Sequence, residues 1–292
     1  MGKENRAANN NCAQSNLAFT ASWLHFRATY HMKIGLCTSV QQADIAAKSG
    51  FDYVEENVQT LLMAEAADEV FAPILKVAQN APLPTLAANC FLPGALKCTG
   101  PAVDLERIVR YAETAFRRAR QVGMRFIVFG SGGSRQVPEG FDHAHARDQF
   151  LTCLRRIAPL AEEHDVIIVV EPLHKKECNF INSLADGASF VEATNHPHVR
   201  LLADFYHMLK DGEDPNEIVV HGKWIQHVHV AECEGRFAPG TAGEDFGPFL
   251  RALKQIDFKG AISYECGWKQ FPEQAPGSVQ GFREQIQQAG LA

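Results

Sequence analysis

The stretch "HDVIIVVEPLHKKE" (164–177) contains the pattern that decides the fold. Five aliphatic residues, "VIIVV" (166–170), are followed directly by the carboxylate of Glu171, and Glu177 follows six residues later. An apolar run that is too short for a helix is typical of a strand buried on both faces of a parallel sheet. The acid at its end indicates that this strand carries a polar group to the edge of the sheet.

The same unit recurs along the chain, with short apolar runs alternating with longer amphipathic segments. In the segment 104–123, apolar residues recur at helical spacing and Gly123 marks the exit, which predicts a helix. Eight strands and about eight helices in alternation predict a single α/β domain over residues 32–292, a closed (β/α)8 TIM barrel. The predicted strands are "KIGLC" (33–37), "YVEE" (53–56), "PTLAA" (84–88), "RFIVFG" (125–130), "VIIVVE" (166–171), "VRLLAD" (199–204), "WIQHVHV" (224–230) and "AISYE" (261–265).

The first 31 residues differ from the rest of the chain. They are polar and Asn-rich at first and only weakly hydrophobic afterwards, whereas Met32 opens "MKIGLC", which reads as the start of a first strand. We therefore expect residues 1–31 to be a poorly ordered extension outside the barrel.

Composition excludes several classes of protein. A formal net charge of -6 and a pI near 6.1 provide no basic face for nucleic acid. No apolar stretch approaches the roughly 20 residues that cross a bilayer, so we expect no membrane partner. The eight cysteines include no CxxC pair, which indicates reduced thiols in a cytoplasmic protein.

Four consecutive predicted strands each deliver one metal-binding side chain. These residues are Glu171, Asp204, His229 and Glu265, at or near the ends of strands five to eight. In a (β/α)8 barrel the carboxyl ends of the strands meet at one rim, and three carboxylates gathered there repel one another unless a cation neutralises them. One imidazole and three carboxylates suit one divalent ion, with Mn²⁺ preferred over Mg²⁺, Co²⁺ or Zn²⁺.

Each of these residues also fits a structural role when taken alone. Asp204 is well placed to cap the following helix, and either histidine of "HVH" (227–229) would fit a barrel core. His227 and His229 share a face of their strand, and His229 lies closer to the rim, so His229 is the expected ligand. His207 stands one helical turn after Asp204, which brings it towards the same pocket.

Four motifs of the chain are characteristic of a known family: "EPLHKKE" (171–177), "DFYHM" (204–208), "HVHVAECEGRFAPG" (227–240) and "SYECGW" (263–268). On these motifs, and over about residues 32–288, the chain resembles the sugar phosphate isomerase/epimerase superfamily with a xylose isomerase-like barrel, and within it the D-tagatose/D-psicose 3-epimerase group. Two positions depart from the pattern, because the family often has Asn where His174 stands, and its Arg usually lies one residue nearer the strand-seven His than Arg236 does.

The resemblance implies that Glu171, Asp204, His229 and Glu265 bind the ion. It implies in addition that four further residues contact the oxygens of a small sugar substrate: His174, Glu177, His207 and Arg236. Trp268 is a candidate for an apolar wall of the pocket, with core packing as its alternative. The resemblance also points to homodimers or homotetramers.

The resulting hypothesis is a metal-dependent sugar isomerase or epimerase. A proton beside a ketose carbonyl is removed to give a metal-stabilised enediolate, and Glu171 and Glu265 act as the two bases, one on each face. The alternatives are a dehydratase of a cyclic polyol or ketone, similar to inosose dehydratases, and a non-catalytic sugar-binding relative. A three-zinc endonuclease of the same superfamily needs further histidines after strands three and four, where the chain has "AANCF" (87–91) and "FGSGGS" (129–134).

Overall fold

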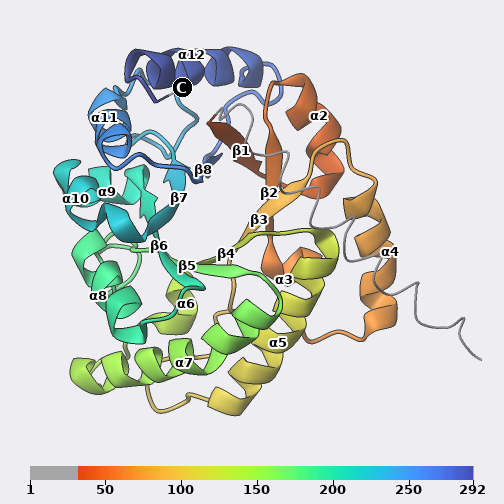
Figure 1. The fold of residues 1–292 in the computed structure, drawn as a ribbon, viewed down its shortest axis with the longest axis vertical. Coiled ribbons are helices and arrows are strands. Elements are labelled where there is room, and N and C mark those ends of the chain that lie inside the picture. The colour runs from red at the N-terminus through yellow and green to blue at the C-terminus, as the bar shows by residue number, and fades with distance from the viewer. Residues whose placement is uncertain (1–31, 292) are drawn as a thin grey trace, which may run out of the picture. The chain divides into compact units, whose positions relative to one another are not determined.

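The computed structural model describes residues 32–291, so the predicted extension over residues 1–31 lies outside the described part. Within that part, eight parallel strands pair in chain order and close into a barrel (Figure 1), as the sequence predicts. Their observed ends differ from the predicted ones by at most one residue. The strands are β1 (Lys33–Cys37), β2 (Tyr53–Asn57), β3 (Thr85–Asn89), β4 (Phe126–Phe129), β5 (Ile167–Val170), β6 (Val199–Asp204), β7 (Ile225–Val230) and β8 (Ala261–Tyr264).

The helices surround the barrel (Figure 1). Short helices α3, α6 and α9 follow the ends of β2, β4 and β6 in addition to the connecting helices, so the alternation is less strict than predicted. The reason is local: side-chain oxygens of Asn57 and Asp204, for example, cap the first turns of α3 and α9. The helices are α2 (Ala43–Lys48), α3 (Val58–Leu61), α4 (Asp68–Gln79), α5 (Leu105–Val122), α6 (Gly132–Arg135), α7 (His143–Glu163), α8 (Leu184–Thr194), α9 (Phe205–Asp211), α10 (Asn216–His221), α11 (Gly247–Gln255) and α12 (Ala275–Gln288), with 3-10 turns η2 (Val40–Gln42) and η3 (Gly222–Trp224).

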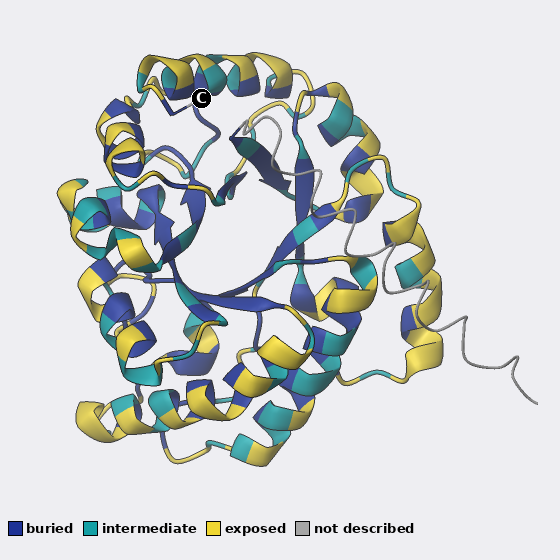
Figure 2. Ribbon diagram, in the orientation of Figure 1, coloured by how far each residue is buried: buried dark blue, intermediate teal, exposed yellow. Residues whose placement is uncertain are grey.

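The two longest helices show how the outer layer is fixed. The side chain of Asp104 accepts a hydrogen bond from the backbone N–H of Arg107 at the start of α5, and Gly123 ends that helix with a φ of 89°. Asp142 caps α7 in the same way. The buried residues of α5, such as Ala112 and Phe116, pack inward, and Figure 2 shows the buried positions concentrated on the strands and on the helix faces turned towards them.

Strand alternation divides the barrel interior into layers. Every second residue of a strand faces inward, and a buried apolar cluster occupies the amino-terminal and middle layers. Closer to the carboxyl ends the inward positions are polar, and the parallel register places Asp204 beside His229 and His229 beside Ser263. The apolar cluster consists of Ala87, Phe126, Val128, Ile167, Val169 and Leu202.

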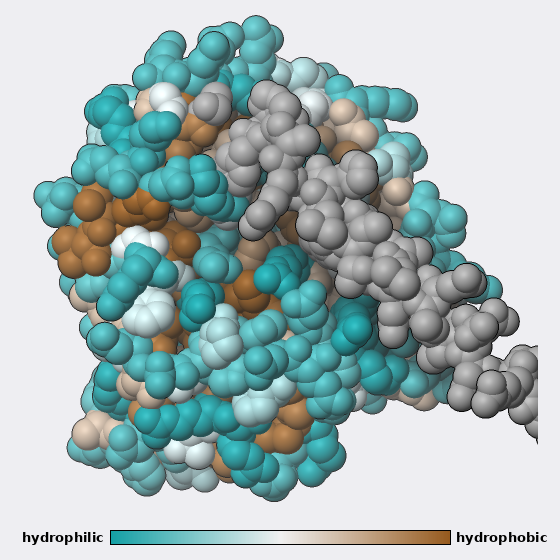
Figure 3. Space-filling view, in the orientation of Figure 1, coloured by the Kyte–Doolittle hydropathy of each residue, from teal (hydrophilic) through white to brown (hydrophobic). Residues whose placement is uncertain are grey.

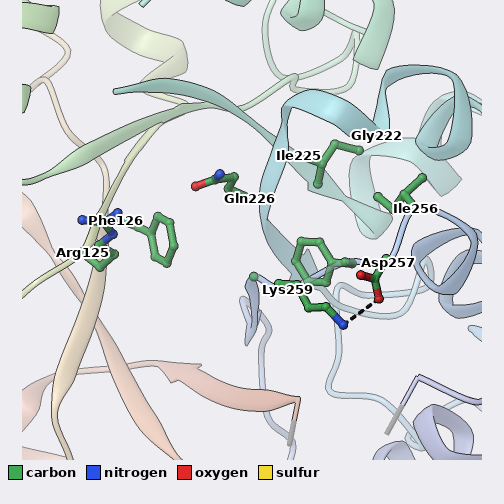
Figure 4. Close-up of a pocket in the computed structure, with 10 residues that line it drawn as sticks. Arg125, Phe126, Gly222, Ile225, Gln226, Ile256, Asp257 and Lys259 are labelled. Atoms are coloured by element: carbon green, nitrogen blue, oxygen red, sulfur yellow. Dashed lines mark ion pairs between the residues drawn. The ribbon is translucent and has the colours of Figure 1, made fainter. Parts of the chain in front are cut away.

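A pocket of about 330 Å³ lies at the opposite, amino-terminal end of the barrel (Figure 4). Phe126 and Ile225, the first residues of β4 and β7, line it together with the ion pair between Lys259 Nζ and Asp257 Oδ1 at 2.6 Å. The side chains at the carboxyl ends of the strands therefore take no part in this pocket.

The outer surface is mainly hydrophilic on the face drawn in Figure 3, with a hydrophobic area near α9 and α10. Val220 of α10 is 58% exposed. Among the described residues, no helix is both long and apolar enough to cross a membrane. All seven cysteines of this part of the chain are free thiols.

Glu213, in the turn after α9, generates a prediction about stability and pH. Burial raises the pKa of its carboxyl to about 7, although the Leu184 N–H that it accepts opposes the shift. Because the pKa is raised in the folded protein, the contribution of Glu213 to the stability of the folded state is fully present below the ordinary pKa of a glutamate. This contribution is lost as pH rises through about 7. Glu213→Gln keeps an oxygen that accepts the Leu184 N–H. We expect the melting temperature of this variant to fall between pH 5 and pH 8 by a few degrees less than that of the wild type.

Thermal unfolding at several pH values checks this expectation. Glu139→Gln is the matched control, because Glu139 is exposed and the substitution should leave the pH dependence as it is in the wild type. Equal slopes for wild type and Glu213→Gln would contradict the assignment.

Candidate active site

The four residues predicted at the ends of β5 to β8 come together around one imidazole nitrogen. Nδ1 of His229 lies 3.0 Å from Glu171 Oε1, 3.4 Å from Glu265 Oε2 and 3.8 Å from Asp204 Oδ2. His229, Asp204 and Glu171 are buried, and the Glu265 side chain is 21% exposed. Strand alternation explains the convergence. Side chains two positions apart in a strand point to the same side, so each of the four residues points into the barrel, as the residue two positions before it does.

Asp204 caps the following helix with one carboxylate oxygen and turns the other towards the pocket. Its Oδ1 accepts the backbone N–H of His207 at 3.1 Å and so caps α9. Its Oδ2 is buried and has no hydrogen-bond partner among the described residues. A buried carboxylate oxygen without a donor is costly, which suits an oxygen that receives a cation or a ligand.

His207 lies beside this group, and one atom each of Glu171, Asp204, Glu265 and His207 falls within a mutual distance of 4.8 Å. Nδ1 of His207 accepts the backbone N–H of His174 at 3.2 Å. A neutral ring that accepts at Nδ1 carries its proton on Nε2, so His207 presents an N–H donor. That Nε2 is buried and has no hydrogen-bond partner in the described chain, so His207 is better suited to an oxygen acceptor than to a metal ion.

Glu265 is held on both oxygens. Asn89 Nδ2 at the end of β3 donates to Glu265 Oε1 at 3.0 Å, and Arg236 Nη2 forms an ion pair with Oε2. Arg236 also lies 3.8 Å from Glu177 Oε2, and its guanidinium carbon is 4.7 Å from the ring centre of Tyr206. Arg236 therefore joins the group around His229 to the outer part of the pocket.

His174 and Glu177 form that outer part. His174 Nε2 lies 3.6 Å from Glu177 Oε2, and the His174 and His207 ring centres are 5.1 Å apart. Nδ1 of His174 is a further buried atom without a hydrogen-bond partner among the described residues. The structure thus brings His174, Glu177, His207 and Arg236 together next to the four strand-end residues.

Trp268 is placed differently. Its half-buried ring stacks against Tyr264 at 6.2 Å and contacts Phe271 at 5.2 Å between ring centres. These are aromatic contacts of the rim after β8, which agree with the packing alternative and leave a role as a pocket wall untested.

The charges shift the titration of the buried groups. Burial and the negative charge of Glu265 raise the pKa of Glu171 above its ordinary value. Burial alone would raise the pKa of Glu265 as well, but His229 and Arg236 lower it. Burial also opposes a charged His229, yet Glu55 and Glu265 raise the pKa of His229 well above its ordinary value. The site therefore holds its negative charge close to one imidazole and one guanidinium.

Glu55 is a buried carboxylate that sequence reasoning missed. It lies on β2 with 1% of its surface exposed, and it contacts His229 Nε2 at 2.8 Å and His227 Nε2 at 2.7 Å. His227 is fully buried one layer below His229, as the spacing predicts. A detectable signal existed, because two adjacent acids in a predicted strand must point to opposite sides, so one of them faces the barrel interior.

Glu232 organises the loop that carries Arg236. Its side chain is fully buried, and its carboxylate accepts four backbone N–H groups of the same loop. Gly235 and Arg236 follow with φ values of 67° and 52°, a left-handed turn that directs Arg236 back towards Glu265. The four donors are Gly240 at 2.8 Å, Ala242 at 2.5 Å, Gly243 at 3.1 Å and Glu244 at 3.3 Å.

Comparison with known proteins identifies the family of this barrel. Residues 43–287 match the sequence profile of the family described as "Xylose isomerase-like TIM barrel". The chain is similar to an L-ribulose 3-epimerase of Methylomonas sp., with 30% identity over 120 residues, which cover 41% of this chain and 42% of that protein. A D-psicose 3-epimerase of Enterocloster bolteae is 24% identical over 229 residues, 76% of this chain and 74% of that protein.

Coverage of the curated relatives is uneven. The match to a 3-dehydro-D-guloside 4-epimerase of Escherichia coli is 30% identical and spans 38% of this chain and 43% of that protein. The matched segments therefore span about two fifths of the Methylomonas and Escherichia coli relatives. Among solved structures, a D-allulose 3-epimerase of Methylomonas sp. in complex with D-allulose has a TM-score of 0.75 and 21% identity, covering 88% of this chain and 98% of that one, and this likeness concerns the fold.

Gly130, directly after β4, generates a prediction about the space that the site needs. A Cβ at this position would overlap Glu171 Oε2. We expect Gly130→Ala to displace the Glu171 carboxylate and to lower the free energy of unfolding by about 1–3 kcal/mol, as overpacking of a buried site does. Urea unfolding followed by circular dichroism measures this loss.

Gly277 supplies the matched control for Gly130→Ala. It lies in helix α12, and nothing stands within 4 Å of a Cβ added there. Gly277→Ala should raise the free energy of unfolding by about 0.5–1 kcal/mol, because alanine favours a helix over glycine. A Gly130→Ala protein as stable as the wild type would show that Glu171 does not need the space beside Gly130.

Proposed function

Because the chain belongs to the xylose isomerase-like TIM barrel family, we propose that it is a divalent-metal-dependent isomerase or epimerase of sugars. The observation that supports this most is the convergence of three carboxylates on Nδ1 of His229, at 3.0, 3.4 and 3.8 Å. The names of the relatives, L-ribulose 3-epimerase and D-psicose 3-epimerase, suggest a ketose 3-epimerase.

The residues fit a bound cation. Glu171, Asp204, His229 and Glu265 would hold it, and the buried Oδ2 of Asp204, without a partner among described residues, is an oxygen ready to accept one. Oxygen ligands with one imidazole suit Mn²⁺ first, and Mg²⁺, Co²⁺ or Zn²⁺ as alternatives. When bound, such an ion supplies Lewis-acid polarisation of a carbonyl oxygen and its neighbouring hydroxyl.

In this proposal, two carboxylates move the proton. Epimerisation removes a proton from the carbon beside the ketone and returns it to the other face of the planar enediolate. Glu171 comes from β5 and Glu265 from β8, so the two approach the pocket from different sides of the barrel. Glu265 Oε2 pairs with Arg236, so Arg236 must exchange this oxygen for a substrate oxygen before Glu265 acts as a base.

The outer residues suit the hydroxyl groups of a sugar. Nε2–H of His207 offers a donor, Glu177 an acceptor and Arg236 a charged donor, and Nδ1 of His174 is buried with no partner in the described chain. Trp268 and its aromatic neighbours would bound the pocket on the β8 side. Fixed polar groups at this spacing orient a chain of hydroxyls relative to the reacting carbon.

Metal dependence is tested by thermal unfolding. The protein stripped with EDTA should gain stability on addition of Mn²⁺, by about 2.7 kcal/mol at 100 times the dissociation constant. Ca²⁺ at the same concentration controls for ionic strength and shows whether the site prefers Mn²⁺ to Ca²⁺. If none of Mn²⁺, Co²⁺, Mg²⁺ and Zn²⁺ changed the melting temperature, the proposed metal dependence would be wrong.

The reaction is tested by NMR in D₂O with a panel of free and phosphorylated ketoses and inososes. We expect deuterium at the carbon beside the carbonyl together with the epimer, and Glu265→Gln should slow both by about 10²–10⁴-fold if the variant still binds Mn²⁺. Glu273→Gln, at an exposed position of the loop after β8, is the matched control with wild-type rate. Net loss of water from an inosose would assign a dehydratase instead. A Glu265→Gln variant that exchanges deuterium at the wild-type rate would exclude Glu265 as a base.

A further inference from the structure

A buried polar network lies directly beneath the group that converges on Nδ1 of His229. Its centre is Glu55 on β2, and it also contains Tyr53, His227, His229 and Ser263, each 0% exposed. Three donors converge on the two oxygens of Glu55: His229 Nε2 reaches Oε1 at 2.8 Å, whereas His227 Nε2 and Ser263 Oγ reach Oε2 at 2.7 and 2.6 Å.

The direction of these hydrogen bonds is determined by the chemistry of the groups. A carboxylate has no proton to donate, so each nitrogen that contacts it must carry one. The Ser263 hydroxyl donates to Glu55 Oε2, and Tyr53 OH, 2.7 Å from Ser263 Oγ, completes the chain by donating to Ser263. His229 and His227 both therefore carry a proton on Nε2.

This assignment decides which nitrogen of His229 faces the acids above it. With Nε2–H directed at Glu55, the Nδ1 atom is the one turned towards Glu171, Asp204 and Glu265. In the absence of a cation Nδ1 also carries a proton, which it donates to Glu171 Oε1 at 3.0 Å, and a divalent ion would take the place of this proton. We propose that Glu55 is a positioning residue that fixes the ring orientation and tautomer of His229, so that Nδ1 is available to the divalent ion. This inference rests on the proposed metal dependence, and it adds a residue from β2 to a site otherwise built by β5 to β8.

His227 and Ser263 keep the Glu55 carboxylate from turning. Both occupy Oε2, which leaves Oε1 for His229. The His227 ring is itself held, because it stacks on Phe126 with ring centres 5.3 Å apart and meets the His229 ring edge to face at 5.3 Å. Carboxylate partners of metal-binding histidines typically contribute about 10–100-fold to metal affinity or activity.

A glutamine at position 55 tests the idea with almost no change in shape. It offers one acceptor and one NH₂ group in place of two acceptors, so one of the two histidines meets a donor where it needs an acceptor. We expect Glu55→Gln to weaken Mn²⁺ binding, measured by isothermal titration calorimetry, about 10–100-fold relative to the wild type.

Glu56→Gln is the matched control on the same strand. The Glu56 carboxylate accepts the backbone N–H groups of Val40 at 2.6 Å and Asn57 at 3.0 Å, away from the two histidines. This variant should lose some thermal stability and bind Mn²⁺ within about threefold of the wild type. An equal loss of affinity in both variants would mean that any lost buried carboxylate weakens the site, which would overturn the specific role of Glu55.

A second measurement does not depend on the folding of any variant. Long-range ¹H–¹⁵N spectra of the Mg²⁺-loaded wild type report the tautomer of each histidine, and His229 should be protonated at Nε2. A proton on Nδ1 of His229 would overturn the inference. In the folded Glu55→Gln variant, the same spectra should show a changed tautomer or a shifted Nε2–H signal at His229 or His227.

The outcomes separate this inference from the proposed function. A wild type that binds none of the four metals contradicts the metal-dependent enzyme, and the inference about Glu55 falls with it. A wild type that binds Mn²⁺, together with a folded Glu55→Gln variant of unchanged affinity, contradicts the role of Glu55 alone.

Discussion

The burial of negative charge at the carboxyl end of the barrel is the constraint on which the site depends. Glu55, Glu171, Asp204 and Glu265 all direct oxygens towards one imidazole, His229. Buried carboxylates are costly unless donors or cations compensate them, and a missing donor costs about 1–3 kcal/mol or more. The remaining features of the site, including the Arg236 ion pair and the proposed cation, follow from this need for compensation.

Strand alternation is what allows such a charged group to coexist with a stable core. Inward positions near the start and middle of the strands are apolar, as in Val128, Val169 and Leu202, and those nearer the rim are polar. Glycines leave room for the large polar side chains inside the barrel. A Cβ at Gly130 would overlap Glu171, and a Cβ at Gly35 would overlap the ring of Tyr53. The apolar layers stabilise the barrel, and the rigid strands hold the polar rim in place.

In the proposed reaction, the strand ends supply the metal ligands and the segments that follow them supply the substrate contacts. The four proposed metal ligands come from strand ends, whereas His174, Glu177, His207 and Arg236 come from the segments that follow β5, β6 and β7. The loop after β7 has little regular structure, and the four N–H groups bound by Glu232 replace the missing backbone pairing. Loops of this kind vary without disturbing the barrel, which is how one fold serves several sugar substrates.

The sequence alone determined the barrel and the proposed ligand set, because both depend on short-range pattern. Apolar runs of strand length, each followed by an amphipathic helix, identify parallel strands, and the residue after such a run must lie at the rim; that reasoning found Glu171, Asp204, His229 and Glu265. Only the tertiary structure decided the contacts between strands distant in the chain. Glu55 meets His229 across 174 positions and Asn89 meets Glu265 across 176. These pairings depend on barrel closure and strand register, which no local pattern encodes. The same closure decides that Nε2 of His229 faces Glu55 and that Nδ1 faces the three acids at the rim.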